Sequence, residues 1–259
     1  MKEIMRSKEE KRIITGKIIG IEDEYYKIAG KNIPCAILWY ENIKILIPCT
    51  HIGINKINKA IMRGMLGAEI DYIVMEIDTV ANIAIASRKD AMELRAKLEL
   101  TKLKSNDVVK VRIVSVGIKH IIVELYGKEV IINADELQHT YILNCKEEYL
   151  VGEYLKARVK EIDIQNSIFK LSAKEFVENP YKNIRKYIID EGEYTRKVIG
   201  FPKKNSGIIV QLDVINVTCL VRVPARFNSY PHYFDKVLIR VNEIKEEKKW
   251  IVGYLVRVI

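Results

Sequence analysis

The stretch Val159-Lys160-Glu161-Ile162-Asp163 decides the fold of this chain, because close variants of it occur twice more. The other two are Val74-Met75-Glu76-Ile77-Asp78 and Val241-Asn242-Glu243-Ile244-Lys245. The three copies start 85 and 82 residues apart. This period is too long for a solenoid repeat and suits a small complete domain. The chain therefore uses one structural unit three times, and its function is expected on a repeated surface rather than in a single cleft.

Each copy lies in a segment where apolar and polar residues alternate, which is the pattern of a half-buried strand. A few turn-like residues follow, and then a second short strand at 83–87, 168–172 and 250–253. Each repeat is thus predicted to end in a β-hairpin. Upstream of the hairpin, each repeat holds three more strand-like segments and a short crossover. Five antiparallel strands of this length suit a small closed barrel, because closure removes exposed sheet edges.

The predicted fold class is mainly β, with three tandem five-stranded barrels joined by short helical connectors. The first connector is rich in helix formers, and the second is punctuated by Asn179-Pro180. The predicted chain begins with a charged and solvated lead-in at 1–12. The three barrels follow at 13–88, 105–174 and 191–259, and the two connectors lie between them at 89–104 and 175–190.

The charge of the chain is unevenly distributed. Its 43 basic and 34 acidic side chains give a net charge of +9. Residues 1–104 carry a net charge of +4, residues 105–180 carry −2, and residues 181–259 carry +7. An excess of positive charge favours attraction to a polyanion. We expect the third repeat to dominate electrostatic contact and the middle repeat to act as a spacer or a protein-contact module.

Several classes of protein are disfavoured by the residue pattern. The four cysteines lie far apart and form no CxxC pair, and residues 1–11 show no secretion signal, so reduced, buried thiols in a cytoplasmic protein are expected. No apolar run reaches membrane-spanning length. The four histidines have no metal-ligand spacing, and no nucleophile elbow or Walker loop is present. We therefore expect no enzyme activity, no metal site, no cofactor and no membrane partner.

The order and spacing of these elements resemble the S1 RNA-binding domain, an OB-fold barrel found in ribosomal protein S1 and in many RNA-handling proteins. The second repeat matches best, through Val116-Gly117, 127–133, Asp135-Glu136-Leu137, Val151-Gly152-Glu153 and Leu171-Ser172-Ala173-Lys174. The first repeat matches through 47–51, Leu66-Gly67 and 86–89, and the third more loosely through Gly192-Glu193-Tyr194 and 207–212. The whole chain after residue 12 resembles a short, multi-domain protein of the ribosomal protein S1 type.

The resemblance implies an RNA-binding face made of aromatic side chains on the second strand, a His or similar residue after the third strand, and an Asp with an Arg nearby on the closing hairpin. The predicted RNA-binding residues of the three repeats are Trp39, Tyr40 and His51, then Lys119, His120 and Asn133, then Phe201, Lys203, Lys204, Arg222, Arg226 and Trp250. The second repeat departs from the family pattern, because Lys119 and Ile122 stand where aromatic residues are usual. Weak base stacking is therefore expected in that repeat.

Structural roles compete with binding at several of these positions. Trp39 and Tyr40 are adjacent on a strand, so they point to opposite faces and one of them is expected in the core. A structural role for both is the leading interpretation, with base stacking by one of them as the alternative. For Phe201 and Trp250 a core position is the leading interpretation, with stacking as the alternative. Two interpretations of Lys203 and Lys204 are equally supported: they contact phosphate groups, or they lie in a solvated turn and bind nothing. Two further residues, Asp78 and Asp163, favour hairpin turns by local hydrogen bonding.

The function predicted from these observations is binding of single-stranded RNA, with mRNA as the expected ligand, in translation or RNA metabolism. A monomer with a ribosome as a further partner is expected. One alternative is a protein-docking scaffold on the ribosome or another complex, which the acidic middle repeat favours. Another is a single-stranded DNA binder, because an OB groove distinguishes RNA from DNA poorly without contacts to the 2′-hydroxyl.

Overall fold

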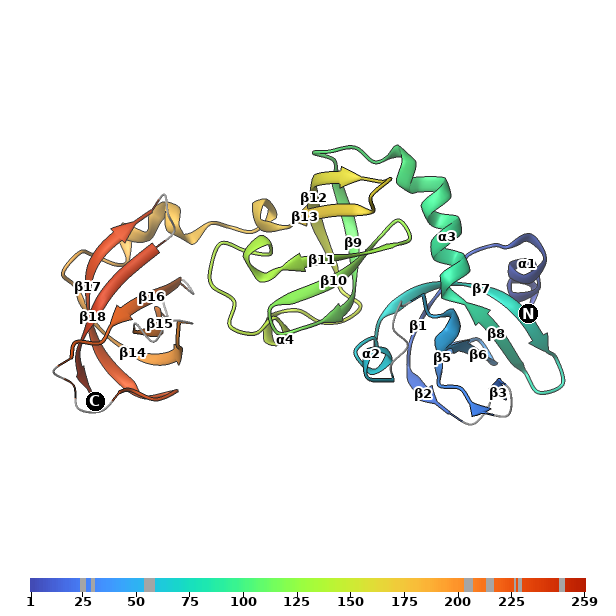
Figure 1. The fold of residues 1–259 in the computed structure, drawn as a ribbon, viewed down its shortest axis with the longest axis horizontal. Helices are drawn as coiled ribbons and strands as arrows, with labels where there is room; N and C mark the ends of the chain where they lie inside the picture. Colours follow the sequence, from blue (N-terminus) through green and yellow to red (C-terminus); the bar gives the residue numbers. More distant parts are fainter. Residues whose placement is uncertain are drawn as a thin grey trace. The chain divides into compact units, whose positions relative to one another are not determined.

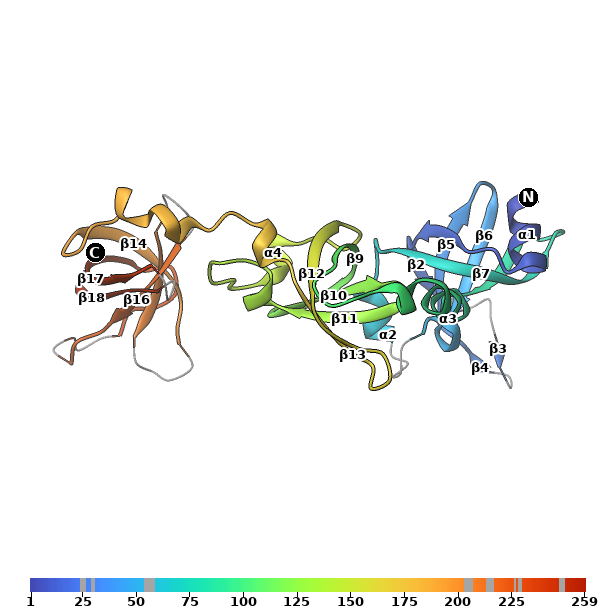
Figure 2. The ribbon, with the colours of Figure 1, turned by 90° about the horizontal axis from the view of Figure 1, so that it is seen from above.

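A computed structural model of the 259-residue chain describes residues 1–23, 27–28, 31–53, 59–202, 207–212, 217–225, 227, 230–246 and 250–259. The described part is mainly β, as predicted, and its strands form three sheets of barrel type and one small hairpin (Figures 1 and 2). The chain divides into two compact units. Unit 1 contains Met1–Asn133 and Asn144–Ser172, and unit 2 contains Ala134–Leu143 and Ala173–Ile259.

Barrel 1 is a sheet of six strands in the order β1-β7-β8-β6-β5-β2. The strands are β1 (Ile14–Lys17), β2 (Gly20–Glu22), β5 (Cys35–Tyr40), β6 (Ile43–Pro48), β7 (Glu69–Asp78) and β8 (Ile83–Ser87). β1 and β2 are two halves of one strand, since the Ile18 N–H donates to Ala68 O and the Ile19 N–H donates to Ile37 O. The same strand thus pairs with both edges of the sheet, and the five predicted strands close into a barrel.

The remaining elements of barrel 1 lie around these strands. β3 (Lys27–Ile28) and β4 (Lys31–Asn32) form a separate two-stranded hairpin. The crossover to β7 contains a 3₁₀ helix, Cys49–His51, and the short helix α2 (Lys59–Arg63). β6 and β8 pair in parallel, whereas the other strands of the sheet pair antiparallel.

Residues 2–10 form the helix α1 (Lys2–Glu10), which is exposed except at two positions. Ile4 is fully buried and belongs to the core of barrel 1 together with Leu38 and Tyr72. Ser7 is also buried, and its Oγ accepts a hydrogen bond from the Val74 N–H at 3.0 Å. The predicted solvated segment is therefore exposed over most of its length, and the prediction was wrong for Ile4 and Ser7, which attach one side of the helix to the barrel. Burying one isoleucine contributes about 1.5–3 kcal/mol.

Barrel 2 has the strand order β11-β10-β9-β12-β13. The strands are β9 (Val108–Val116), β10 (His120–Leu125), β11 (Lys128–Asn133), β12 (Tyr154–Asp163) and β13 (Ile168–Ser172). The outer strands β11 and β13 come into contact without forming ladder pairs, so this barrel is nearly closed. Its crossover contains a 3₁₀ helix, Ala134–Glu136, and the short helix α4 (Cys145–Glu148).

The first connector is the helix α3 (Arg88–Glu99), followed by a 3₁₀ turn at Leu100–Lys102. The Ser87 Oγ caps the helix by accepting from the Asp90 N–H at 3.1 Å. The second connector contains 3₁₀ turns at Lys174–Phe176 and Pro180–Lys186. Both predicted connectors are therefore helical. The exact six-part division of the chain stays a prediction, because residues 134–143 group with unit 2.

Barrel 3 is a closed barrel of β14, β15, β16, β18 and β17, in that order. The strands are β14 (Glu193–Gly200), β15 (Ile208–Leu212), β16 (Val217–Arg222), β17 (Lys236–Lys245) and β18 (Trp250–Val258). β16 and β18 pair in parallel, as β6 and β8 do in barrel 1. Inward-facing aliphatic side chains such as Val198, Val210 and Val241 fill the barrel. The predicted fold class, three tandem OB-type barrels, is confirmed.

All four cysteines are free and buried, as predicted. Burial is the largest cause that raises the pKa of Cys35, and burial raises the pKa of Cys219, in both cases to about 12. Because the thiolate is the reactive form, we expect the native protein to resist alkylation by iodoacetamide at about pH 8. Mass spectrometry should find four alkylated cysteines only after unfolding in denaturant. Rapid alkylation of Cys219 in the native protein would contradict its placement in the barrel core.

Candidate nucleic-acid interface

Barrel 1 presents one of its two adjacent aromatic residues to solvent. Trp39 on β5 is 53% exposed, and its cross-strand partner on β6 is Lys44. Tyr40 instead packs partly against the core, and its hydroxyl donates a hydrogen bond to Glu3 of α1. This bond is the main cause that raises the pKa of Tyr40. The predicted opposite orientation of the two rings is confirmed, and Trp39 is the member of the pair that is available to a ligand.

The remaining candidate of barrel 1, His51, ends the 3₁₀ helix Cys49–His51 and is half-buried. Among the described residues, no hydrogen bond or ring contact joins His51 to Trp39. Barrel 1 therefore has an exposed Trp39 ring on its second strand, but Trp39 and His51 do not form one site.

The three candidates of barrel 2 lie together at one end of β10 and β11. His120 and Asn133 are direct cross-strand partners, and exposed Lys119 immediately precedes His120. The His120 ring packs over Gly117, where an added Cβ would lie 2.9 Å from the ring. A side chain larger than glycine at position 117 would therefore displace the histidine.

The rest of that strand face is used for packing inside unit 1. Val114 of β9 is part of the core cluster of barrel 1, and Ile122 of β10 packs against the same cluster. Glu124, two residues further along β10, is buried and paired with Arg88 of α3. Ile122 stands where an aromatic residue that stacks on RNA is usual in the family. In this chain its side chain instead forms part of the contact between barrels 1 and 2.

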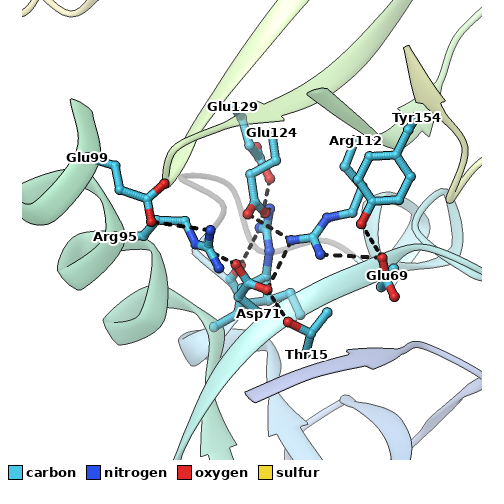
Figure 3. Close-up of polar contacts among 11 residues, drawn as sticks. Thr15, Glu69, Asp71, Arg95, Glu99, Arg112, Glu124, Glu129 and Tyr154 are labelled. Carbon is cyan, nitrogen blue, oxygen red and sulfur yellow. Dashed lines mark hydrogen bonds and ion pairs between the residues drawn. The ribbon is translucent and has the colours of Figure 1, made fainter. Parts of the chain in front are cut away.

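This contact contains a buried network of charged side chains, drawn in Figure 3. Asp71 of β7 lies at its centre: its Oδ2 is 2.7 Å from Arg95 Nε, and its Oδ1 is 3.3 Å from Arg112 Nη2. The Thr15 hydroxyl also donates to Asp71 Oδ1 at 2.7 Å. Arg112 Nη2 is 3.0 Å from Glu124 Oε1. Residues of both barrels and of α3 therefore neutralise one another within a single cluster.

Arg88 is the deepest charge of the network, with no exposed surface. Its Nη1 donates to Ile52 O at 2.9 Å and to Glu129 Oε1 at 2.7 Å, and its Nη2 donates to Glu124 Oε2 at 2.9 Å. Burial lowers the pKa of the neighbouring Arg112, but Glu124 and Asp71 outweigh burial and raise that pKa above its ordinary value. Arg88, Arg95 and Arg112 are already paired with carboxylates, so this cluster is structural rather than a phosphate site.

Barrel 3 carries three candidates within the described residues. Phe201 follows β14, packs partly against the core and makes an edge contact with Tyr233 at 4.8 Å between ring centroids. Arg222 is exposed at the end of β16, with Tyr254 of β18 as its cross-strand partner. Trp250 is 43% exposed at the start of β18, so the core interpretation was wrong for this residue. The other three candidates, Lys203, Lys204 and Arg226, lie outside the described residues.

Sequence reasoning missed three exposed aromatic residues beside Phe201, namely Tyr230, Tyr233 and Phe234. The Phe201 and Tyr230 ring centroids are 6.3 Å apart, and those of Tyr233 and Phe234 are 6.2 Å apart. We call these four residues the aromatic cluster. A signal was present, because three aromatics fall within five residues of a Pro-containing loop.

Two aspartates have the turn role that was expected for them. Asp78 Oδ1 accepts from the Val80 and Ala81 N–H groups, each at 2.9 Å. Asp163 Oδ1 accepts from the Asn166 N–H at 3.0 Å, and this bond is the main cause that lowers the pKa of Asp163. Both carboxylates are therefore occupied by their own hairpins.

The described part of the chain brings no three His, Cys, Asp or Glu side chains together in a way that could hold a metal ion. Within the same residues, no helix has the length and apolar character needed to cross a bilayer.

Comparison with curated proteins gives relatives of low identity, and no family model matches the chain. A 4-hydroxy-3-methylbut-2-enyl diphosphate reductase of Clostridium acetobutylicum is 24% identical over 222 residues, covering 82% of this chain and 34% of the reductase. Small ribosomal subunit protein bS1 of Staphylococcus epidermidis is 26% identical over 123 residues, 46% of this chain and 31% of that protein. The bS1 of Streptococcus pneumoniae is 22% identical over 187 residues, 70% of this chain and 46% of that protein. The chain thus spans less than half the length of each of these relatives.

Solved structures also align with the chain, at low similarity. A Pyrococcus horikoshii a/eIF2alpha–aDim2p–rRNA complex matches 32% of this chain and 52% of the aligned chain, with 18% identity and a TM-score of 0.28. A Streptococcus pneumoniae multidomain protein with nucleic acid binding domains matches 95% of this chain and 73% of its own length, with 15% identity and a TM-score of 0.23. The fold assignment rests on the strand order of the chain itself. The chain resembles the bS1 proteins, which confirms the resemblance predicted from its sequence.

Proposed function

We propose that this chain is a single-stranded RNA-binding protein of the ribosomal protein S1 type, acting on mRNA in translation or RNA metabolism. The observation that carries the proposal is the exposure of Trp39 and Trp250, on strands of two separate barrels. A tryptophan that is left in solvent on a barrel strand is a platform for an unpaired base, and such stacking contributes about 1–3 kcal/mol per base. The positive net charge of the chain and its similarity to bS1 proteins support the same ligand.

The barrels are proposed to share the RNA unequally. Barrel 2 lies in the segment with a net charge of −2, and the outer face of β9 and β10 packs inside unit 1. Barrels 1 and 3 are therefore the main binding modules, and their linkage in one chain raises the affinity by effective concentration. We assign no catalytic role and no cofactor to the chain. We place the protein in the cytoplasm as a monomer, with the ribosome as a further partner.

The proposal is tested by fluorescence anisotropy with labelled single-stranded RNA, single-stranded DNA and duplex RNA at two salt concentrations. We expect single-stranded RNA to bind best and to bind more weakly at the higher salt concentration, because phosphate contacts release counterions. Trp39→Ala and Trp250→Ala should each weaken binding by about 5- to 150-fold, the equivalent of one lost stacking contact. Leu98→Ala is the matched control, since Leu98 is an exposed apolar residue of α3.

Other outcomes would change the assignment. Absence of binding to any nucleic acid at low salt would favour the protein-docking scaffold. Equal affinity for single-stranded RNA and DNA would make the chain a general single-strand binder. If both tryptophan variants bind RNA with wild-type affinity, Trp39 and Trp250 are not part of the RNA-binding interface.

A further inference from the structure

We infer that barrel 3 carries an additional docking surface for single-stranded RNA, formed by the aromatic cluster and by three cations on the outer face of β14, β17 and β18. The cations are Lys197, Lys236 and Arg257, and we call them the cationic strip. Trp250 lies at the other end of the β17–β18 ladder, opposite Lys245, whereas Lys236 begins β17. Phe201 is the residue that this surface shares with the candidates described above. The inference rests on the proposed function, since it names a further site for the same ligand.

The aromatic cluster is exposed to an extent that burial in the barrel does not explain. Tyr233 is 52% exposed and Phe234 is 75% exposed. Phe201 anchors the group, because it packs against the barrel core on one side and against Tyr233 on the other. Exposed apolar groups that gather in one place mark interaction surfaces more often than isolated ones do.

Hydrogen bonds hold the backbone of residues 232–235, which carries two of these rings. The Phe234 N–H donates to Val198 O at 2.9 Å, and the Val198 N–H donates to Asp235 O at 3.0 Å. The His232 N–H donates to Asp235 Oδ2 at 2.8 Å. Phe234 has a φ of 69°, a left-handed conformation that costs a bulky residue about 1–2 kcal/mol. The backbone is thus held in a strained conformation at an exposed phenylalanine, and such conformations cluster at binding and active sites.

The cationic strip begins beside these rings. Lys236 follows Phe234 by two residues, and its direct cross-strand partner is Lys197 of β14. Both side chains are exposed, and like charges placed opposite each other repel. Arg257 of β18 is also exposed and lies opposite Leu238, the next outward position of β17. Within the described residues, none of these three cations has an ion-pair partner, whereas Arg240 further along β17 is paired with Glu193.

The combination of flat rings and unpaired cations fits a chain that alternates planar bases with anionic phosphates. Bases stack on the exposed ring faces, and a phosphate between Lys197 and Lys236 removes their mutual repulsion. An acidic peptide would neutralise the lysines but would leave the rings without stacking partners. A single strand is favoured over a duplex because only unpaired bases expose their faces.

The test uses the full chain and a labelled single-stranded RNA of about 10 nucleotides, within the range that one OB barrel covers. We expect a Tyr233→Ala/Phe234→Ala variant to bind this RNA more weakly than the wild-type protein. Each base that no longer stacks on an aromatic ring should lower the affinity by about 5- to 150-fold. A Lys197→Gln/Lys236→Gln variant should lower the slope of log affinity against log salt by about 1.4, since each phosphate contact contributes about 0.7. The controls are exposed residues of the same kind in the second connector, Tyr187→Ala, at 49% exposed, and Lys182→Gln/Lys186→Gln.

A second measurement does not depend on the variants. Photo-crosslinking of bromouridine-substituted RNA to the wild-type chain should label residues 230–234, as read by mass spectrometry. If wild-type protein binds RNA but both variants keep its affinity and salt slope, the additional surface is refuted and the proposed function stands. If wild-type protein binds no RNA but captures an acidic peptide, both the surface and the proposed function are refuted.

Discussion

Replacing Arg88 by alanine is expected to lower the free energy of unfolding of unit 1 by about 3–5 kcal/mol, the usual cost of removing one partner of a buried ion pair. The guanidinium donates to Glu124, Glu129 and the Ile52 carbonyl, and it has no contact with solvent. Its removal leaves Glu124 buried with Arg112 as its remaining charged partner, and it leaves the Ile52 carbonyl without this donor. The loss therefore combines a buried carboxylate that keeps one of its two cationic partners with an empty volume.

The measurement can be confined to unit 1 by tryptophan fluorescence. The chain has two tryptophans, so in a Trp250→Phe background Trp39 reports the unfolding of barrel 1. Urea unfolding of Arg88→Ala is compared with Lys89→Ala, which removes an exposed charge from the same turn of α3. A change below about 1 kcal/mol for Arg88→Ala would show that the network adds little to the contact between the barrels.

Truncation of Ile4 to alanine is expected to cost about 2–5 kcal/mol, the range measured for large-to-small changes in cores. Ile4 is fully buried in the core of barrel 1, although it belongs to a helix in which most of the other residues are exposed. The loss of this side chain should weaken the attachment of α1 to the barrel. The hydrogen bond from the Val74 N–H to Ser7 should then exchange with solvent more readily.

Urea unfolding in the same Trp250→Phe background measures this effect. Met5→Ala is the control, because Met5 is the next residue and is partly exposed. Equal destabilisation by Ile4→Ala and Met5→Ala would mean that helix propensity, rather than burial of Ile4, determines the stability of α1. Faster amide exchange at Val74 in Ile4→Ala alone would support the docking described above.

The strands could be predicted from the sequence because their signal is local. Alternation of apolar and polar residues identifies a strand within a few positions, and the pleat alone places Trp39 and Tyr40 on opposite faces. The repeat of the pentapeptide then supplied the number of barrels. The alternation depends only on neighbouring residues, and the structure has a sheet of barrel type for each copy of the repeat, as expected.

The contacts between elements could not be predicted in the same way. Arg88 and Glu124 are 36 residues apart and look like ordinary surface charges until the fold brings them together. Ile4 is one apolar residue in a charged run, and only the position of β7 explains its burial. The exposure of Trp250 was missed because tryptophan is usually well buried, and a general preference does not say which strand position faces solvent.

The buried network also limits how freely the three repeats can be exchanged. A barrel placed after α3 must offer carboxylates where Glu124 and Glu129 stand, or Arg88 loses its partners in the interior. The turn between β10 and β11 must also keep Gly127, because a Cβ there would overlap the Met92 carbonyl of α3. Barrels 1 and 2 are therefore matched to each other, and a chimaera that carried barrel 3 in the second position would inherit a buried charge with no counterion.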